Sequence, residues 1–250
     1  MTGRPVRTLS SLLAVVMAAA CTSYFEIPIE TPIRPKLDTT GFQRVLVAGF
    51  LAGGSADLDG TLETTRLLRS QLRTKSDLRV IDTDVLPLLD VAAEGTDAAT
   101  QAAAKAPIKE EKVLESFEHL FAKVDYWKKV GEEFQQPLIV TGTVMFAPQA
   151  RSGIVQRDQE VYDSFGRRRV VPVRTYMERK GFVLKPRFIF IDGRTGTILH
   201  TENYREEILY NANQTSPALS SYFELMDRLI PSFLSTLSSQ RIKGTRILLQ

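Results

Sequence analysis

The sequence predicts an α/β fold of the α+β type, in which a mixed β-sheet is packed by about three helices and carries an extended β-hairpin arm. Three observations lead to this class. In the first half, short apolar runs typical of buried strands alternate with segments of helical periodicity. In the second half, two hairpin patterns precede a final amphipathic helix. The composition, with 43% hydrophobic and 24% charged residues, is that of an ordinary globular protein.

A strand, a helix and a second strand are expected first. Residues 44–50, RVLVAGF, form a short apolar run that predicts a buried strand. Leucines at helical spacing then predict an amphipathic helix that ends near Lys75, with Thr61 as its candidate cap. Residues 77–84 predict the second strand. The intervening DLDG, residues 57–60, resembles a fragment of a calcium loop without the other ligands, and a helix cap is the alternative interpretation.

The most regular helical pattern covers residues 110–136, where large apolar side chains recur every three or four positions until Pro137. Residues 92–109 contain few large apolar side chains and predict a loop or a frayed helix. Residues 138–146, LIVTGTVMF, predict a strand, and residues 217–237 predict the closing helix. Together these segments supply the remaining helices expected to pack on the sheet.

Two hairpins are expected between that strand and the closing helix. Residues 154–177 turn near DSFGRRR, which predicts the extended arm. A tight turn joins the strands of the second hairpin, and we assign it to Asp192, Gly193, Thr195 and Gly196. In such turns an aspartate hydrogen-bonds back to the backbone and a glycine adopts positive φ, so these residues are interpreted as structural.

Residues 1–20 have the pattern of a lipoprotein signal peptide. Two arginines precede an apolar stretch that, at about a dozen residues, is too short to span the ~30 Å hydrocarbon core of a bilayer. The stretch ends at Ala20, directly before Cys21, which is the single cysteine of the chain. This junction resembles the bacterial lipobox, although Ala18 stands where that motif usually has leucine.

The lipobox resemblance implies cleavage after Ala20, a diacylglycerol on the sulfur of Cys21 and an acyl chain such as palmitate on its new amine. Such a modification carries more than the two lipid signals that stable membrane anchoring needs. The alternative is an ordinary signal peptide that leaves Cys21 as a free thiol, which is a liability in an oxidising compartment.

Residues 21–41 contain Pro28, Pro32 and Pro35, which predicts a semi-rigid tether, and residues 42–250 are then expected to form the domain. Without the signal segment, 30 basic residues face 29 acidic residues, which leaves a net charge of +1. A chain so close to neutral lacks the basic excess of a nucleic-acid-binding protein, and no nucleic-acid partner is expected.

Three segments resemble a known family: RVLVAGF with its following helix and LRVID, then PLIVTGTV, and FIFIDGRTGTILHTENY. They resemble the curli-secretion (CsgG-like) lipoproteins and relatives such as the activators of penicillin-binding proteins. The resemblance implies an anticodon-binding-domain-like fold in an outer-membrane lipoprotein whose domain faces the periplasm. It implies a non-enzymatic assembly, scaffolding or regulatory module in envelope biogenesis or secretion, and it leaves homo-oligomer formation open. The alternative is a ring-forming subunit of a curli-type secretion channel.

A channel subunit of that kind inserts hairpins whose strands alternate apolar and polar residues over about nine to eleven positions. In the first strand of the arm, both alternating sides carry charged residues near the middle. In the second strand, Pro172 interrupts the one mildly apolar row. Because a charge at the bilayer midplane costs about 2–4 kcal/mol, the sequence argues against a membrane pore.

The arm is also the candidate binding surface, because it pairs aromatic residues with arginines, as the energetically dominant parts of protein interfaces do. The candidate partner-binding residues are Tyr162, Phe165, Arg167, Arg168, Arg169 and Tyr176. Arginines at the tip suit anionic lipid head groups, glycan strands or an acidic partner protein. The alternative is a solvated turn without a ligand.

The sequence contains no catalytic constellation that we recognise. Its two histidines, His119 and His200, are distant in sequence, and neither has metal-type spacing. A nucleophile elbow and a complete phosphate-binding loop are both missing from the sequence. We therefore expect no enzymatic activity, no metal and no cofactor.

Overall fold

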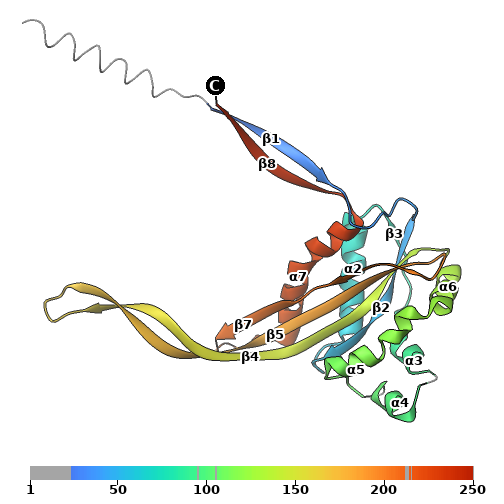
Figure 1. Ribbon diagram of the computed structural model, residues 1–250, viewed down its shortest axis with the longest axis horizontal. Coiled ribbons are helices and arrows are strands. Elements are labelled where there is room, and N and C mark those ends of the chain that lie inside the picture. The colour runs from blue at the N-terminus through green and yellow to red at the C-terminus, as the bar shows by residue number, and fades with distance from the viewer. Residues whose placement is uncertain (1–23, 95, 105, 212–213, 215, 250) are drawn as a thin grey trace, which may run out of the picture. The chain divides into compact units, whose positions relative to one another are not determined.

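Figure 1 shows the computed structural model of the chain. The residues that it describes are 24–94, 96–104, 106–211, 214 and 216–249. The predicted signal peptide, its cleavage residue Ala20 and the predicted lipidation residue Cys21 lie outside the described residues.

The chain divides into two compact units, one of Lys36–Ser238 and the other of Met1–Pro35 together with Ser239–Gln250. The sequence placed this boundary at residue 41 and extended the domain to the end of the chain. The structure instead separates the last twelve residues from the domain and joins them to the proline-containing segment.

The smaller unit is a two-stranded antiparallel sheet of β1 (Tyr24–Ile33) and β8 (Gln240–Leu249). Pro28 and Pro32 lie within β1, which is an edge strand and therefore tolerates residues that lack a backbone N–H. The segment expected as a semi-rigid tether is thus paired over ten residues with residues 240–249. The pairing joins residues more than 200 positions apart, and no local pattern indicates it.

The larger unit contains a mixed sheet of six strands, in the order β3-β2-β4-β5-β6, with β7 also paired to β5. β2 runs parallel to β3 and β4, and the other pairs are antiparallel. The predicted α+β class is confirmed. The strands are β2 (Arg44–Gly54), β3 (Arg79–Val80), β4 (Leu138–Tyr162), β5 (Arg168–Asp192), β6 (Ile198–Asn203) and β7 (Glu206–Asn211).

One face of this sheet is covered by α2 (Gly60–Lys75) and α7 (Ala218–Leu237) (Figure 1). Both helices lie where the leucine spacing predicted them. Asp59 caps α2, because its carboxylate accepts a hydrogen bond from the N–H of Leu62 at 3.0 Å. DLDG is therefore a helix cap, and the expected cap residue Thr61 instead donates its hydroxyl to the carbonyl of Phe50.

The other face is covered by short helices instead of the single helix expected over residues 110–136, and that prediction is wrong. One helix would bury Val124 together with Leu120 and Phe121, yet Val124 is 42% exposed while Leu120 and Phe121 are buried. The chain breaks around them, and the carbonyl of Leu120 accepts the indole N–H of buried Trp127 at 3.0 Å. The elements are α3 (Leu88–Ala93), α4 (Ala98–Ala104), α5 (Glu111–Ser116), the 3-10 helix η1 (Glu118–Ala122) and α6 (Val124–Glu133).

In the part of the chain that the structure describes, no helix combines the length and the apolar character needed to cross a membrane.

Candidate interaction site

The most prominent surface feature is a long hairpin formed by β4 and β5 (Figure 1). The two strands pair without a register shift from Leu138 opposite Asp192 to Tyr162 opposite Arg168. β2 accompanies β4 as far as Phe146, and β7 accompanies β5 only from Arg179 onward. Residues 152–178 are therefore a two-stranded ribbon, which we call the arm, and it lies close to the expected 154–177.

The tip of the arm is held by Asp163. Its N–H donates to the carbonyl of Arg167 at 3.0 Å, and its carboxylate accepts the N–H groups of Phe165 and Arg167 and the guanidinium of Arg167. These hydrogen bonds keep the pKa of Asp163 below its usual value, and the bond from the backbone N–H of Arg167 has the largest effect. Gly166 completes the turn with a φ of 72°. The ordered turn presents Phe165, which is 80% exposed, with the Arg167 guanidinium 5.4 Å from its ring centre.

The register divides the arm into two faces, because residues opposite each other in an antiparallel pair share a face. We call one the tyrosine face: Ser152, Ile154, Gln156, Asp158, Glu160, Tyr162, Arg168, Val170, Pro172, Arg174, Tyr176 and Glu178. We call the other the arginine face: Gly153, Val155, Arg157, Gln159, Val161, Arg169, Val171, Val173, Thr175 and Met177.

The structure distributes the six candidate partner-binding residues over three places. Tyr162, Arg168 and Tyr176 share the tyrosine face, while Arg169 lies on the arginine face. The other two, Phe165 and Arg167, form part of the turn. The six residues predicted as one surface are therefore divided. The tyrosine face and the adjoining tip hold five of them, and Arg169 lies on the opposite face.

None of the arm's residues is buried, although many are apolar. Eight of the sixteen large hydrophobic side chains that are exposed in the described residues belong to it. They are Ile154, Val161, Tyr162, Phe165, Val170, Val171, Val173 and Tyr176. An isolated two-stranded ribbon gains little stability in water, so these side chains are available for binding and do not serve the core.

Pro172 does not interrupt the apolar row of the second strand as the sequence predicted, because that row lies on the arginine face and Pro172 lies on the tyrosine face. The turn hydrogen bond between Asp163 and Arg167 makes the pairs on the arginine face the hydrogen-bonded ones, since the two kinds of pair alternate. Pro172 lies opposite Asp158 in the other kind of pair, where its nitrogen faces away from β4. The proline therefore costs no ladder hydrogen bond and removes a donor from the outer edge of β5.

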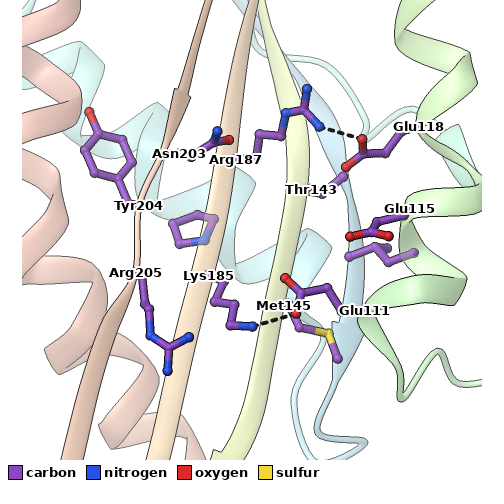
Figure 2. A pocket seen from close by; sticks show the side chains of 12 residues that line it. Glu111, Glu115, Glu118, Thr143, Met145, Lys185, Arg187, Asn203, Tyr204 and Arg205 are labelled. Carbon is purple, nitrogen blue, oxygen red and sulfur yellow. Dashed lines mark hydrogen bonds and ion pairs between the residues drawn. The ribbon is translucent and has the colours of Figure 1, made fainter.

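A second feature is a polar groove of about 230 Å³ between the α5–η1 segment and the strands β5 and β6 (Figure 2). Lys185 pairs with Glu111, and Arg187 pairs with Glu118, each at 2.5 Å. Glu115 lies between the two pairs on the helical side. The sequence reasoning missed this groove, although the helical spacing of its three glutamates was visible. Two of the three cations that line the groove are thus held by its carboxylates, and the third, Arg205, lies 3.8 Å from Glu207.

The turn between β5 and β6 is closed by hydrogen bonds among its own residues. The carboxylate of Asp192 accepts the N–H of Arg194 at 2.8 Å and two guanidinium hydrogen bonds at 3.0 Å. Gly196 has a φ of 74° and donates its N–H to the Asp192 carbonyl. Gly193 lies against α6, where a Cβ on Gly131 would come within 1.7 Å of its carbonyl oxygen. Thr195 shares a hydrogen bond with a neighbouring hydroxyl within the turn.

The two histidines have separate local partners. Nδ1 of His119 lies 3.0 Å from the carbonyl of Ser116, and Nε2 of His200 lies 2.8 Å from the carboxylate of Glu202. Within the described residues, His, Cys, Asp and Glu side chains form no group of three or more that could hold a metal ion.

Comparison with known proteins gives structural similarity only. No protein-family model and no curated protein match the chain. The fold is similar to lipoprotein GNA1162 from Neisseria meningitidis, with 13% identity and a TM-score of 0.35 over 76% of this chain and 96% of that one. It is also similar to a neuraminyllactose-binding hemagglutinin homolog from Helicobacter pylori, with 10% identity and a TM-score of 0.36 over 82% and 88% of the two chains. The CsgG-like resemblance stays a prediction from the motifs.

We expect the Asp192→Asn variant to lose stability in a pH-dependent way. Burial alone would raise the pKa of Asp192, but the hydrogen bonds and charge of Arg194 outweigh it and lower the pKa. The carboxylate therefore stabilises the fold above its unfolded pKa near 3.8, and this contribution disappears as the pH falls through the lower folded value. Urea unfolding at pH 7 should show a loss of about 1.5–3 kcal/mol.

Below the folded pKa the wild-type side chain is also neutral, so the difference between the two proteins should shrink. Urea titrations at neutral pH and at a pH below the folded pKa of Asp192 make this comparison. An equal loss of stability at both pH values would contradict the assigned role of the charge.

Proposed function

We propose that the chain is a non-enzymatic outer-membrane lipoprotein that acts as an assembly, scaffolding or regulatory module in envelope biogenesis or secretion. Cleavage after Ala20 and lipidation of Cys21 would anchor it, with its domain in the periplasm. Its docking surface for a partner protein is the tyrosine face with the tip of the arm. The observation that carries this proposal is an ordered ribbon whose apolar and aromatic side chains are exposed and support no core.

The tyrosine face has the composition of a protein interface. Tyr162 and Tyr176 are 68% and 67% exposed, and both are large, rigid side chains of the type that dominates interface energies. Arg168 on the same face forms an ion pair with Glu160 at 2.8 Å. The face carries both signs of charge, so a partner would be selected by shape and aromatic contact more than by net charge.

A hairpin inserted in a membrane fits the arm less well. Arg157 lies midway along the arginine face, and Asp158 and Glu160 lie midway along the tyrosine face. An arginine at the bilayer midplane costs about 2–4 kcal/mol and a carboxylate costs less but is still unfavourable, so neither face suits hydrocarbon. The charges that the sequence placed on both sides of the arm therefore remain on both faces of the folded ribbon.

The proposal is tested by placing a photo-crosslinking amino acid at single positions of the chain in cells. Positions 162 and 176 sample the tyrosine face, and positions 171 and 173 on the arginine face serve as matched controls in the same ribbon. We expect a discrete protein adduct from the tyrosine face and none from the arginine face. An adduct twice the mass of the chain would identify a second copy as the partner. Absence of adducts from positions 162 and 176 would contradict the proposal.

A further inference from the structure

We infer that the arginine face of the arm binds the anionic head-group surface of a lipid bilayer. The inference concerns the face opposite the proposed protein-docking surface and adds a second ligand class to the same arm. Its test contains no partner protein, so it can fail or succeed independently of the proposed function.

The charges of the arm are sorted by face. The tyrosine face carries three carboxylates, those of Asp158, Glu160 and Glu178, beside two arginines. The arginine face carries Arg157 and Arg169, and the carboxylate nearest to it is that of Asp163 in the turn. The alternation of the strands therefore gives one face of mixed charge and one face whose charged strand residues are both arginines.

The two cations of the arginine face are also available. The side chain of Arg157 has no hydrogen bond or ion pair with any other described residue. Nε of Arg169 lies 4.0 Å from the carboxylate of Asp163, which is already held by Arg167 at 3.0 Å. An exposed contact of that length contributes little, so both guanidinium groups can engage an external anion.

Apolar side chains lie directly across from these arginines. Val173 is the register partner of Arg157, and Val161 is the register partner of Arg169. Val171 lies between them on the same face, and the three valines are 36–44% exposed. Each guanidinium is thus flanked by methyl groups, an arrangement that suits phosphate contact with shallow apolar contact at a membrane surface.

Two observations favour a bilayer surface over an acidic protein. The arginine face contains no aromatic side chain, whereas energetically dominant protein contacts are enriched in Tyr and Trp. Arg157 and Val161 lie four residues apart on one strand, about 13 Å, so the cations are spread along the ribbon and do not form one pocket. Guanidinium groups that are spaced along a ribbon suit a surface that presents many separate phosphates. Each guanidinium can bind one phosphate through two hydrogen bonds.

The test uses flotation with vesicles of phosphatidylcholine alone or of phosphatidylcholine mixed with phosphatidylglycerol. The chain is produced from Thr22 onward, so that neither the apolar leader nor a lipid on Cys21 carries it to the vesicles, and every described residue is kept. Arg157→Gln with Arg169→Gln removes two cations from the arginine face. Arg168→Gln with Arg174→Gln removes two from the tyrosine face and is the matched control.

The wild-type chain should float with the anionic vesicles and not with the neutral ones, and added salt should release it. A basic residue near an anionic surface contributes roughly fivefold to partitioning, so the arginine-face variant should bind on the order of thirtyfold more weakly. The tyrosine-face variant should stay within about twofold of the wild type, because its cations point away from the vesicle. Equal unfolding midpoints of the three proteins show that the fold is retained.

Equal losses in the two variants would mean that net charge alone drives binding, and would overturn the inference. Failure of the wild-type chain to float with anionic vesicles would also overturn the inference. If that chain is instead retained on immobilised polyglutamate through Arg157 and Arg169, the face belongs to an acidic protein and the lipid assignment is wrong.

Discussion

Replacing Gly142 by alanine is expected to lower the free energy of unfolding by about 3–5 kcal/mol. Gly142 lies in β4 at the centre of the sheet with a φ of 145°, which side-chain-bearing residues rarely adopt. A Cβ there would lie 1.8 Å from the carbonyl oxygen of Arg187 on β5. Both atoms belong to paired backbone of central strands, so relief requires the sheet itself to shift. Urea unfolding monitored by circular dichroism measures the loss.

The matched control is Gly153→Ala, in the same strand but in the arm. A Cβ at Gly153 would have no other atom within 4 Å, so the substitution meets open space. We expect it to stay within about 1 kcal/mol of the wild type, in the stabilising direction, because alanine restricts the unfolded chain more than glycine does. Wild-type stability of the Gly142→Ala variant would contradict the close approach of β4 and β5.

Local sequence patterns predicted many of the helices, strands and turns of the domain. The apolar run RVLVAGF predicts β2, leucine spacing predicts α2 and α7, and the Asp192-Gly193 pair marks the turn between β5 and β6. In each case the signal and the structural cause lie within a few neighbouring residues. Gly142 lies within the predicted strand LIVTGTVMF, but its close approach to the backbone of β5 depends on a residue more than forty positions away.

The remaining features depend on distant contacts. The break around Leu120 leaves Val124 exposed although Val124 belongs to the apolar repeat, so helical periodicity alone does not indicate the break. The pairing of β1 with β8 joins residues 24–33 to residues 240–249. The prolines of the expected tether do not indicate a partner strand. Such non-local pairing has no local sequence signal.

The candidate site was predicted by composition and refined by register. Aromatic residues and arginines mark the arm in the sequence, but their division into two faces requires the pairing fixed by the Asp163 turn. Arg169 therefore separates from Arg168, its neighbour in sequence, and joins Arg157 on the other face. The groove of Glu111, Lys185 and their neighbours was missed because its charges come from distant segments.

Excising the arm is expected to abolish partner binding and leave the domain folded. Arg151 and Arg179 are register partners at the base of the arm, so an Asn-Gly pair can join them as a two-residue hairpin turn in place of residues 152–178. No arm residue is buried, so the hydrophobic core loses nothing. The unfolding free energy should change by less than about 1 kcal/mol, as for surface changes.

The same excised chain tests the central claim that the arm is the working surface of an anchored docking module. The measurement is the amount of the crosslinked partner, identified through position 162, that co-purifies from solubilised membranes with the wild-type or the excised chain. We predict a loss of more than about tenfold with an unchanged unfolding midpoint, because the interface's aromatic anchors are gone. Undiminished recovery of the partner with the excised chain would contradict the account and place the docking surface elsewhere on the domain.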